Sequence, residues 1–381
     1  MSRALPATVV GLGVVSLLTD AASEMVFPLL PLFLSQLGGT AVHLGLIEGV
    51  ADAVANVGKL VAGTVADRFD RRRPFVIAGY ALSALARPCL ALATAQVHVA
   101  AVRVTDRIGK GLRGAPRDAL IARAVPPEQR GEAFGFHRAM DHAGAVLGPL
   151  LAIAVLQFVT DDLRTLFWCA AVPGVLAIVA AFAYAREQPA PPPARSAARG
   201  PERGLAAFLA PICLFQLGRA NDVFLLHLAS ARRESITELP LLWIGLHMVR
   251  SATARLGGRL ADQRGFEPAI AAGWLVHAAV FAGLAATRDQ DVIRALFLLY
   301  GLHAGLSEGA EKALIARIAP HKRLGTAFGW YHFAAGGFAL VAAAGFGLVW
   351  DEFGQTVAFG ASATLAAIAA GWLLFLRAAK P

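Results

Sequence analysis

Long apolar stretches alternate with short polar clusters along the whole chain. Most stretches reach the length of about 20 residues that an α-helix needs to cross a bilayer core about 30 Å thick. Breaking the chain at Pro, Gly and polar clusters gives stretches near residues 6–36, 43–66, 74–95, 98–122, 131–157, 164–185, 205–230, 237–261, 267–286, 290–318, 325–349 and 354–377. The pattern predicts an all-α membrane protein with about twelve transmembrane helices.

The alternation of apolar stretches and short polar clusters is interrupted in the middle of the chain. Residues 186–204, AREQPAPPPARSAARGPER, are rich in Pro, Ala and Arg and have almost no large apolar side chains. Such a segment cannot pack and is typical of a hydrated linker. We therefore expect a six-helix bundle over 1–185, a linker over 186–204 and a second six-helix bundle over 205–381.

The two halves also resemble each other in sequence. ALIARAVPPEQRGEAFGF, which starts at Ala119, aligns with ALIARIAPHKRLGTAFGW, which starts at Ala313, and the segment 63–67 aligns with 258–262. The offsets are 194 and 195 residues, so one six-helix unit was duplicated in the same orientation. Parallel halves of this kind place a substrate site between them, near the middle of the membrane.

Composition and charge narrow the class of protein. Hydrophobic residues make up 57% of the chain and charged residues 16%, while the net charge is +9. The basic residues cluster in alternate short loops, which is the positive-inside pattern of a membrane protein rather than a nucleic-acid-binding surface. Their distribution predicts cytoplasmic termini and a cytoplasmic linker, and we expect no nucleic-acid partner.

The residues that usually carry catalysis or bind metal show no such arrangement here. Cys89, Cys169 and Cys213 lie in apolar runs without paired spacing. No metal-site spacing, nucleophile elbow or phosphate-binding loop is visible. We expect no metal, no cofactor and no enzymatic activity. A membrane-embedded enzyme or receptor would need a catalytic constellation or a soluble domain.

The stretch from Gly63 to Arg73, GTVADRFDRRR, resembles the signature loop G-x-L-A-D-r-x-G-R-[KR]-x-[KR] of the major facilitator superfamily. Asp70 stands where the family usually has Gly, and Asp262 lies in a degraded second copy. The resemblance implies a fold of two bundles related by pseudo-two-fold symmetry and a role in membrane transport. It also implies that Gly63 permits close helix contact and that Asp67 pairs with a helix end or an Arg to latch one conformation.

Two further motifs carry the resemblance. Arg107-Ile-Gly-Lys110-Gly is similar to the family pattern R-x-x-Q-G, with Lys110 where Gln is common, and the Arg of that pattern is implicated in proton transfer. Residues 144–149, GAVLGP, match a G-x-x-x-G-P motif associated with exporters, although small residues that let helices touch leave the same trace. The expected conformational residues are Gly63, Asp67, Arg68, Arg71, Arg72, Asp262, Arg117, Asp118, Gly144, Gly148 and Pro149.

Charged residues inside the apolar stretches are the candidates for binding substrate and protons, because charge in a membrane is costly and usually functional. Asp20 and Glu24 lie four residues apart and so share a helical face. Either both pair with Arg or Lys and fix the packing, or one binds the coupling proton or a cationic group of the substrate. The candidates are Asp20, Glu24, Asp106, Arg107, Lys110, Arg138, Asp141, Arg219, Asn221, Asp222 and Glu308.

The resemblance is closer to a subgroup of bacterial members that carry T-D-x-x-S-E-M and G-K-G-x-R-x-x-P-R-D-A-L, found here at 19–25 and 109–120. The hypothesis is a monomeric secondary transporter of the bacterial inner membrane that exports a small organic solute in exchange for protons. The alternative is proton-linked uptake or facilitated diffusion of an organic anion.

Overall fold

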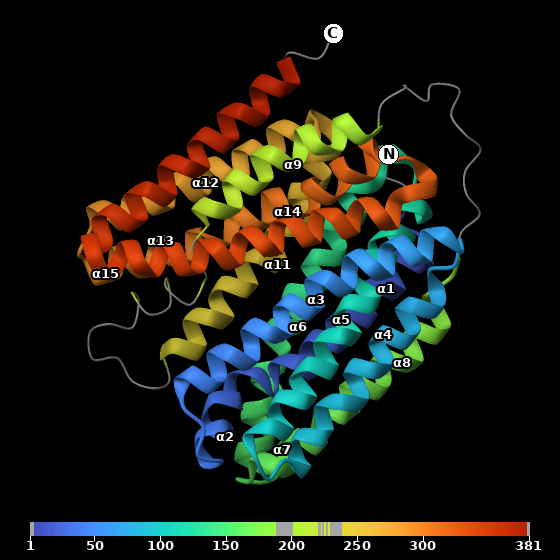
Figure 1. Ribbon diagram of the computed structural model, residues 1–381, viewed down its shortest axis with the longest axis vertical. Helices are drawn as coiled ribbons and strands as arrows, with labels where there is room; N and C mark the ends of the chain where they lie inside the picture. The colour runs from blue at the N-terminus through green and yellow to red at the C-terminus, as the bar shows by residue number, and fades with distance from the viewer. Residues whose placement is uncertain are drawn as a thin grey trace. The chain divides into compact units, whose positions relative to one another are not determined.

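The computed structural model describes residues 4–187, 201–219, 222, 225, 228 and 238–378, and these residues are helical apart from short connections (Figure 1). Most of the expected linker and Asn221 lie outside this part of the chain. The first half contains α1 Ala7–Glu24, η1 Phe27–Leu29, α2 Leu30–Gln36, α3 Ala41–Arg68, α4 Arg73–Ala86, η2 Arg87–Leu92, α5 Gln96–Ala124, η3 Pro127–Gln129, α6 Arg130–Phe158, α7 Leu163–Cys169 and α8 Ala171–Tyr184. The second half contains α9 Pro201–Gly218, α11 Glu238–Arg264, α12 Phe266–Ala286, α13 Gln290–Leu299, α14 Gly301–Ile318, η4 His321–Arg323 and α15 Leu324–Ala378.

Length and composition identify the candidate membrane spans. Among the described residues, six helical segments are long and apolar enough to cross a bilayer: Ala7–Gln36, Arg73–Leu92, Pro127–Phe158, Leu163–Tyr184, Phe266–Ala286 and His321–Ala378. The last is 58 residues long and so offers length for two crossings. The long helices α3, α5 and α11 and the helix α14 are more polar, and their charged residues form much of the candidate site.

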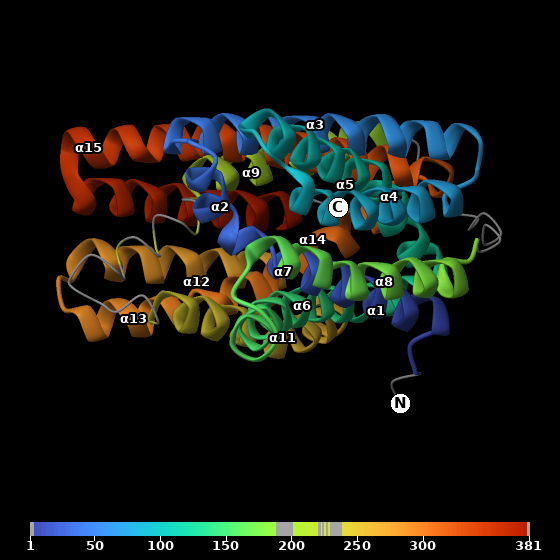
Figure 2. The same cartoon turned by 90° about the horizontal axis from the view of Figure 1, so that it is seen from below.

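The last long helix turns back on itself at Gly354, where φ is +82°. That backbone conformation is open to glycine and strained for most other residues. Figure 2 shows the two arms of α15 joined at this bend. Phe346 on one arm and Phe359 on the other pack edge to face with ring centroids 5.2 Å apart, and Trp350 lies 5.3 Å from Phe359. The bend and these aromatic contacts make two antiparallel helices from one apolar run.

The helices pack into two compact units. The first unit comprises Met1–Pro126, Met140–Pro193 and Pro320–Phe333, and the second comprises Pro127–Ala139, Ala194–Ala319 and Ala334–Pro381. The first turns of α6 therefore belong to the second unit, and the first turns of α15 belong to the first unit. Each unit thus receives the start of one helix whose remainder lies in the other unit.

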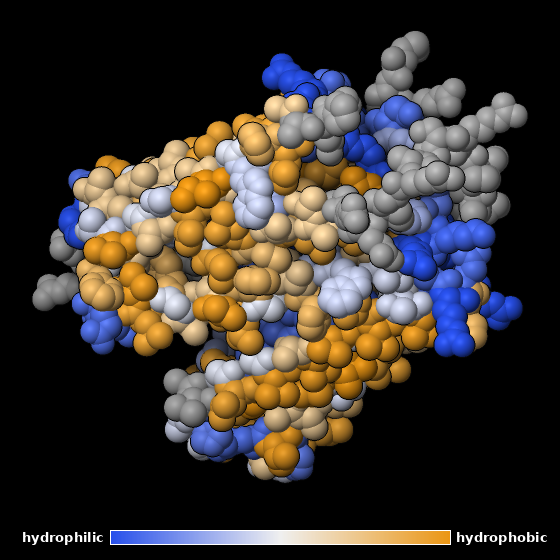
Figure 3. All heavy atoms as spheres, turned by 45° about the horizontal axis from the view of Figure 1, so that its top comes forward, coloured by the Kyte–Doolittle hydropathy of each residue, from blue (hydrophilic) through white to orange (hydrophobic). Residues whose placement is uncertain are grey.

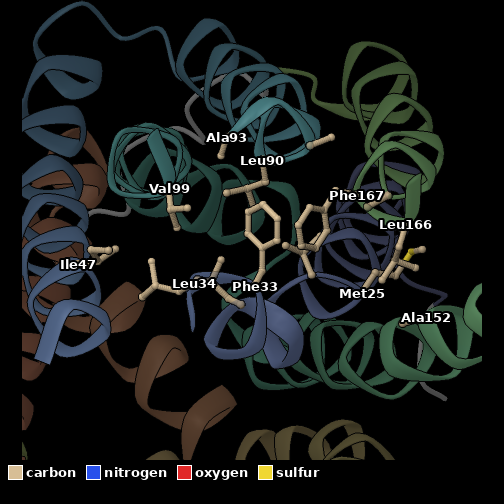
Figure 4. Packing of buried hydrophobic residues seen from close by; sticks show 14 residues of the cluster. Met25, Phe33, Leu34, Ile47, Leu90, Ala93, Val99, Ala152, Leu166 and Phe167 are labelled. Atoms are coloured by element: carbon tan, nitrogen blue, oxygen red, sulfur yellow. The ribbon is translucent and has the colours of Figure 1, made fainter. Parts of the chain in front are cut away.

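An apolar core closes one end of the first unit (Figure 4). Its centre is an edge-to-face pair of Phe33 on α2 and Phe167 on α7, whose ring centroids are 5.0 Å apart. Leu90 of η2 and Val99 of α5 face the same cluster and are fully buried. Segments from the beginning, middle and end of the first half are thereby held together by aromatic and aliphatic packing.

The apolar surface is as informative as the core. Figure 3 shows hydrophobic side chains over most of the face in view, with hydrophilic residues gathered at its margins. On α8, large apolar side chains are more than half exposed, among them Val172, Val175, Leu176 and Val179. A water-soluble protein rarely leaves a helix face of this kind uncovered. Lipid contact accounts for it.

Each unit contains a closely packed pair of helices, and the residues at the two contacts are separated by the same 194 positions as the sequence repeat. In the first unit α4 crosses α5 so tightly that a Cβ on Gly79 would lie 2.6 Å from the carbonyl oxygen of Gly109. In the second unit α12 crosses α14, and a Cβ on Gly273 would lie 2.9 Å from the carbonyl oxygen of His303. Both residues of the second pair lie 194 positions after those of the first. The duplicated halves therefore use the same backbone contact.

Replacing Gly79 with Leu should destabilise the first unit, because the new side chain would overlap the Gly109 carbonyl and the Cβ of Arg113, 2.8 Å away. Overpacking of this kind costs roughly 1–3 kcal/mol. The measurement is the unfolding temperature of the purified protein in detergent. The matched control is Gly371→Leu, because nothing lies within 4 Å of a Cβ at that exposed position. Equal unfolding temperatures for the two variants would contradict the packing described here.

Candidate functional site

The carboxylates of α1 lie where that helix touches α6. A Cβ on Gly144 would lie 2.5 Å from the carbonyl oxygen of Leu17 and 2.9 Å from the Cβ of Asp20. A Cβ on Gly148 would lie 2.6 Å from the Cβ of Glu24. The motif G-x-x-x-G-P therefore sets the backbone of α6 directly against the helix face that carries both carboxylates, and Pro149 follows within the same helix.

A buried ion-pair network surrounds Asp106 on α5. Arg87 of η2 contacts the Oδ1 atom of Asp106 through Nε at 3.1 Å and through Nη2 at 3.0 Å. It also donates to the carbonyl oxygen of Thr19 on α1 at 2.9 Å. Arg103 lies 3.6 Å from the other carboxylate oxygen. All three charged side chains are at most 5% exposed. Their mutual attraction offsets the free-energy cost of removing these charges from water.

A second set of pairs joins α5 to α3. Arg103 binds both oxygens of Glu48 at 2.7 Å, in the two-pronged geometry that guanidinium groups favour. Arg107 lies 3.5 Å from Glu48 and 3.4 Å from Asp52. The guanidinium of Arg107 is therefore neutralised by two carboxylates.

Lys110 and Glu24 differ from these neighbours. Lys110 is exposed and makes no ion pair with the described residues, although Asp20 and Asp52 are near enough to interact with it electrostatically. The Oε2 atom of Glu24 is buried and has no hydrogen-bond partner among the described residues. A buried carboxylate oxygen without a partner costs free energy. These two opposite charges face the same region of the first unit and are not joined.

Asp141, Arg117 and Asp118 have partners, whereas Asp20 makes no hydrogen bond or ion pair with the described residues. Asp141 accepts a hydrogen bond from the hydroxyl of Ser16 on α1. Asp118 lies 3.1 Å from Arg117 and 2.9 Å from the Nε2 atom of His332. Asp118 is fully buried, so it holds α5 to the first turns of α15.

The second unit has its own cluster of charges. Arg138 lies 2.9 Å from Glu308 on α14, and Asp222 lies 2.9 Å from Arg250 on α11. Arg219 interacts electrostatically with Asp222, Glu308 and Tyr300. The guanidinium of Arg250 also lies over the Tyr300 ring, 5.4 Å from its centroid. These charges thus lie together in one paired group.

The two signature aspartates bind the beginnings of helices. Asp67 at the end of α3 accepts hydrogen bonds from the backbone N–H of Thr326 at 2.6 Å and from the guanidinium of Arg72 at 2.6 Å. Asp262 on α11 accepts from the N–H groups of Gly131 and Glu132, each at 2.7 Å. The first N–H groups of a helix lack partners within the helix and carry partial positive charge, so carboxylates stabilise them.

The contacts around these aspartates are tight. A Cβ on Gly63 would lie 2.1 Å from the carbonyl oxygen of Gly325, and one on Gly258 would lie 2.0 Å from that of Gly131. Glu132 binds Arg255 and Arg259, each at 2.8 Å. Arg68 and Arg71 are exposed and make no ion pair with described residues. Of the basic residues expected to act in this loop, Arg72 is the one that reaches Asp67.

Asp70 departs from the family pattern in an instructive way. Its φ is +49°, the left-handed conformation in which glycine is usual and Asp and Asn are tolerated. Its carboxylate lies 2.9 Å from Arg72 and 3.0 Å from Arg123, and Arg123 donates to the carbonyl oxygen of His321 at 3.0 Å. The hydrogen bond from Arg72 lowers the pKa of Asp70. The side chain therefore adds ion pairs that a glycine could not make.

Some residues of these networks were not among the candidates expected from the sequence. Arg87, Glu48 and Asp52 are lone charges in otherwise apolar stretches, which is the signal that could have found them. Glu132, Arg255 and Arg259 lie near the expected helix ends and resembled ordinary loop charges. Lone charges need partners, but the sequence does not state which helix supplies each one.

Comparison with known proteins agrees with this architecture. A family model described as "Major Facilitator Superfamily" matches residues 12–307, and the chain belongs to that family. It is therefore a multi-pass membrane protein and a secondary transporter rather than an enzyme. It is 28% identical to an uncharacterized MFS-type transporter of Methanocaldococcus jannaschii, over 98% of this chain and 96% of that protein.

Other relatives match in part or in fold alone. The multidrug resistance protein MdtH of Photorhabdus laumondii is 33% identical over 41% of this chain and 38% of its own length. The crystal structure of the human organic anion transporter MFSD10 superimposes with a TM-score of 0.80 at 17% identity, over 96% of this chain and 99% of that one. The fucose transporter FucP in its outward conformation gives 0.74 at 16% identity, over 96% and 98%. At these identities the structures show the fold, and they confirm the all-helical major facilitator fold expected from the sequence.

Replacing Asp106 with Asn should destabilise the protein strongly, because it leaves Arg87 and Arg103 with less negative charge in a buried setting. Removing one partner of a buried ion pair costs roughly 3–5 kcal/mol. The measurement is the free energy of unfolding in detergent. The control is Asp291→Asn, whose partner Arg294 lies 2.9 Å away but whose own side chain is 89% exposed. That exposed pair should be worth about 1 kcal/mol or less. Similar losses in both variants would show that the Asp106 network is not what holds η2 to α5.

Replacing Asp70 with Asn should remove charge while keeping a residue that tolerates positive φ. Because the pKa of Asp70 is lowered by Arg72, its ion pairs stabilise the folded protein above the unfolded pKa of about 4, and that stability is lost as the pH falls through the lower folded pKa. The side chain is 69% exposed, so we expect a difference of about 1 kcal/mol or less at pH 7. Unfolding temperatures measured from pH 7 down to pH 3 should converge for the two proteins. A constant difference across that range would contradict the assignment.

Proposed function

We propose that this transporter exports a small organic solute in exchange for protons, by alternating access, across a bacterial inner membrane with both termini and the linker on the cytoplasmic side. The observation that carries the proposal is Glu24. It is the carboxylate of the first unit whose Oε2 atom is buried without a partner among the described residues. Asp106, Glu48, Asp118 and Asp141 all have partners nearby.

An unpaired carboxylate in a low-dielectric setting resolves its cost by taking up a proton or by binding a cation. Both outcomes serve exchange, because a single carboxylate cannot hold a proton and a cationic group at once. Charged groups face Glu24 from several elements: Asp20 on its own helix, Lys110 and Arg107 on α5, and Arg87 on η2. The tendency of Glu24 to bind a proton therefore depends on the charges of these surrounding groups.

Two further observations support export. Gly144 and Gly148 press α6 against the helix face of Asp20 and Glu24, which couples the exporter-associated motif to the candidate proton site. One partial relative is named a multidrug resistance protein. Alternating access also needs contacts that hold one state and break in the other. The hydrogen bonds of Asp67 with Thr326 and of Asp262 with Glu132 are suited to that role, since each ties a helix end to a helix beginning.

The experiment uses inside-out membrane vesicles in which respiration acidifies the lumen and quenches acridine orange. Addition of a solute that exchanges for protons should restore fluorescence. We would test panels of small organic cations, anions and zwitterions, with vesicles lacking the protein as the background. An uncoupler should abolish accumulation of any solute that responds. Accumulation that ignores the gradient would reject proton coupling.

In the same vesicles, Glu24→Gln should reduce solute-dependent recovery of fluorescence by about tenfold or more, because the amide cannot take up the proton. The control is Glu352→Gln. Glu352 is exposed and belongs to the second unit, whereas Glu24 belongs to the first. A Glu24→Gln variant that exchanges protons as well as the unmodified protein would remove Glu24 from the mechanism.

The alternative function, uptake or facilitated diffusion of an organic anion, is favoured by one observation. Lys110 is an exposed cation without an ion-pair partner among the described residues. In that case anions would enter the vesicles without dissipating the proton gradient or would move together with protons. The direction of the fluorescence change separates these outcomes from exchange.

A further inference from the structure

Four basic residues lie along one stretch of α5: Arg103, Arg107, Lys110 and Arg113. The three arginines contact side chains of other elements, and Lys110 makes no hydrogen bond or ion pair with the described residues. Arg103 binds Glu48, Arg107 lies beside Glu48 and Asp52, and Arg113 donates to the Ser83 hydroxyl at 2.6 Å. Lys110 lies between Arg107 and Arg113 in the sequence and is exposed, whereas those arginines are not. Its ammonium has no ion-pair partner among the residues that the structure describes.

Opposite charges are nevertheless close to Lys110. Asp20 and Asp52 both interact with it electrostatically, and Lys110 is one of the cations that act on Glu24. The ammonium stays apart from Glu24 while the Oε2 atom of Glu24 stays without a hydrogen-bond donor. Lys110 on α5 and Glu24 on α1 are therefore an open cation and a carboxylate with an unsatisfied oxygen within electrostatic reach of one another, and Asp20, one turn before Glu24, also makes no ion pair with the described residues.

We propose that Lys110 and Glu24 together bind a small zwitterionic solute, with the carboxylate of the solute on the Nζ atom of Lys110 and its ammonium on the carboxylate of Glu24. This assignment rests on the proposed proton exchange and names the class of solute exchanged. One end of an amino-acid-like molecule satisfies Lys110 and the other end satisfies Glu24. A simple anion would leave Glu24 unsatisfied, and a simple cation would leave Lys110 unsatisfied.

The same arrangement links solute to proton. When Glu24 holds the ammonium of the solute it cannot hold a proton, and when it is protonated it loses its attraction for the ammonium. Lys110 keeps its affinity for the carboxylate in both states. Binding of solute and proton is therefore mutually exclusive at one residue, which is the condition that exchange requires.

Lys110 also departs from the family pattern, in which Gln is common at this position. An amide is neutral and could accept or donate a hydrogen bond to a solute without attracting its charge. The lysine adds a full positive charge at that place. The departure therefore gives this chain a means of recognising an anionic group that the common residue lacks.

The test measures binding to the purified full-length protein in lipid nanodiscs by calorimetry and thermal shift. The probes are the standard amino acids, and the tightest of them is then compared with its deaminated carboxylate and its decarboxylated amine. We expect the zwitterion to bind at least about tenfold more tightly than either matched compound. Equal affinity of the carboxylate or the amine, or no shift with any amino acid, overturns the proposal.

Substitutions at Lys110 and Glu24 distinguish loss of charge recognition from a general loss of structure. Lys110→Gln should weaken zwitterion binding by about tenfold or more, while Lys110→Arg should retain it because the charge remains. Glu24→Gln should weaken binding of the zwitterion but not of the matched carboxylate. The control is Lys59→Gln, because Lys59 donates to Asn56 at 3.1 Å on α3. Binding by Lys110→Gln that equals the unmodified protein, or an equal loss in the Lys59 variant, overturns the assignment.

The two proposals can fail separately. Proton exchange with some other solute in the vesicle experiment, combined with no binding of any amino acid, would retain the exchange and remove the zwitterion. Zwitterion binding that does not compete with protons, measured as equal affinity at pH 6 and pH 8, would retain Lys110 and remove the coupling at Glu24.

Discussion

A charge inside a membrane is stable only when another group close by neutralises it, and this constraint orders most of the polar structure. The helix α5 shows it most clearly, since Arg103, Asp106 and Arg107 occupy less than two turns. Their partners on other helices lie on two elements: η2 for Asp106 and α3 for the two arginines. The apolar parts of the fold supply the volume of the bundle. The ion pairs fix the rotation of each helix about its own axis, because a rotated helix would leave several charges unpaired.

The duplication reuses contacts rather than residue types. Gly79 and Gly273 occupy equivalent positions and both admit a neighbouring backbone, yet the residues beneath them are Arg113 in the first unit and Ser307 in the second. Asp67 and Asp262 both bind helix beginnings, but Asp67 also engages Arg72, whereas Asp262, near the end of α11, is followed by a shorter basic run. Backbone geometry is thus common to both units, and the charged side chains differ. Unequal halves are what a transporter needs if only one of them holds the proton.

Much of the fold followed from the sequence, because hydropathy and loop charge report directly on burial in lipid. The apolar stretch 6–36 corresponds to the span Ala7–Gln36, and 267–286 to α12 Phe266–Ala286. The more polar helices were also found, since their flanking loops were distinct. The break at Gly354 coincides with the expected start of the final stretch. The helical class and the family were therefore predictable from pattern and motif alone.

The pairing of charges was less predictable, because sequence gives the phase of each helix but not its rotation against its neighbours. Asp106 and Arg107 were both candidates from position, and nothing in the sequence assigned Arg87 to one and Asp52 to the other. The role of Asp70 depended on a positive φ that only the folded loop reveals. The signature motif did name Asp67, because its chemistry is local and its partner Arg72 lies five residues away.

Arg107 makes ion pairs with the described residues and Lys110 does not, so the folded protein is less stable at Lys110 than a closed ion pair there would make it. Both lie on α5, one turn apart, and both have carboxylates within electrostatic reach. Arg107 is joined to Glu48 and Asp52, while Lys110 is left open opposite Glu24. A pair closed between Lys110 and Glu24 would satisfy both groups and would stabilise the folded chain, but it would also occupy the groups that we propose bind the solute. The paired charges therefore hold the helices together at some cost to adaptability, and the unpaired charges are the ones to which we assign solute binding.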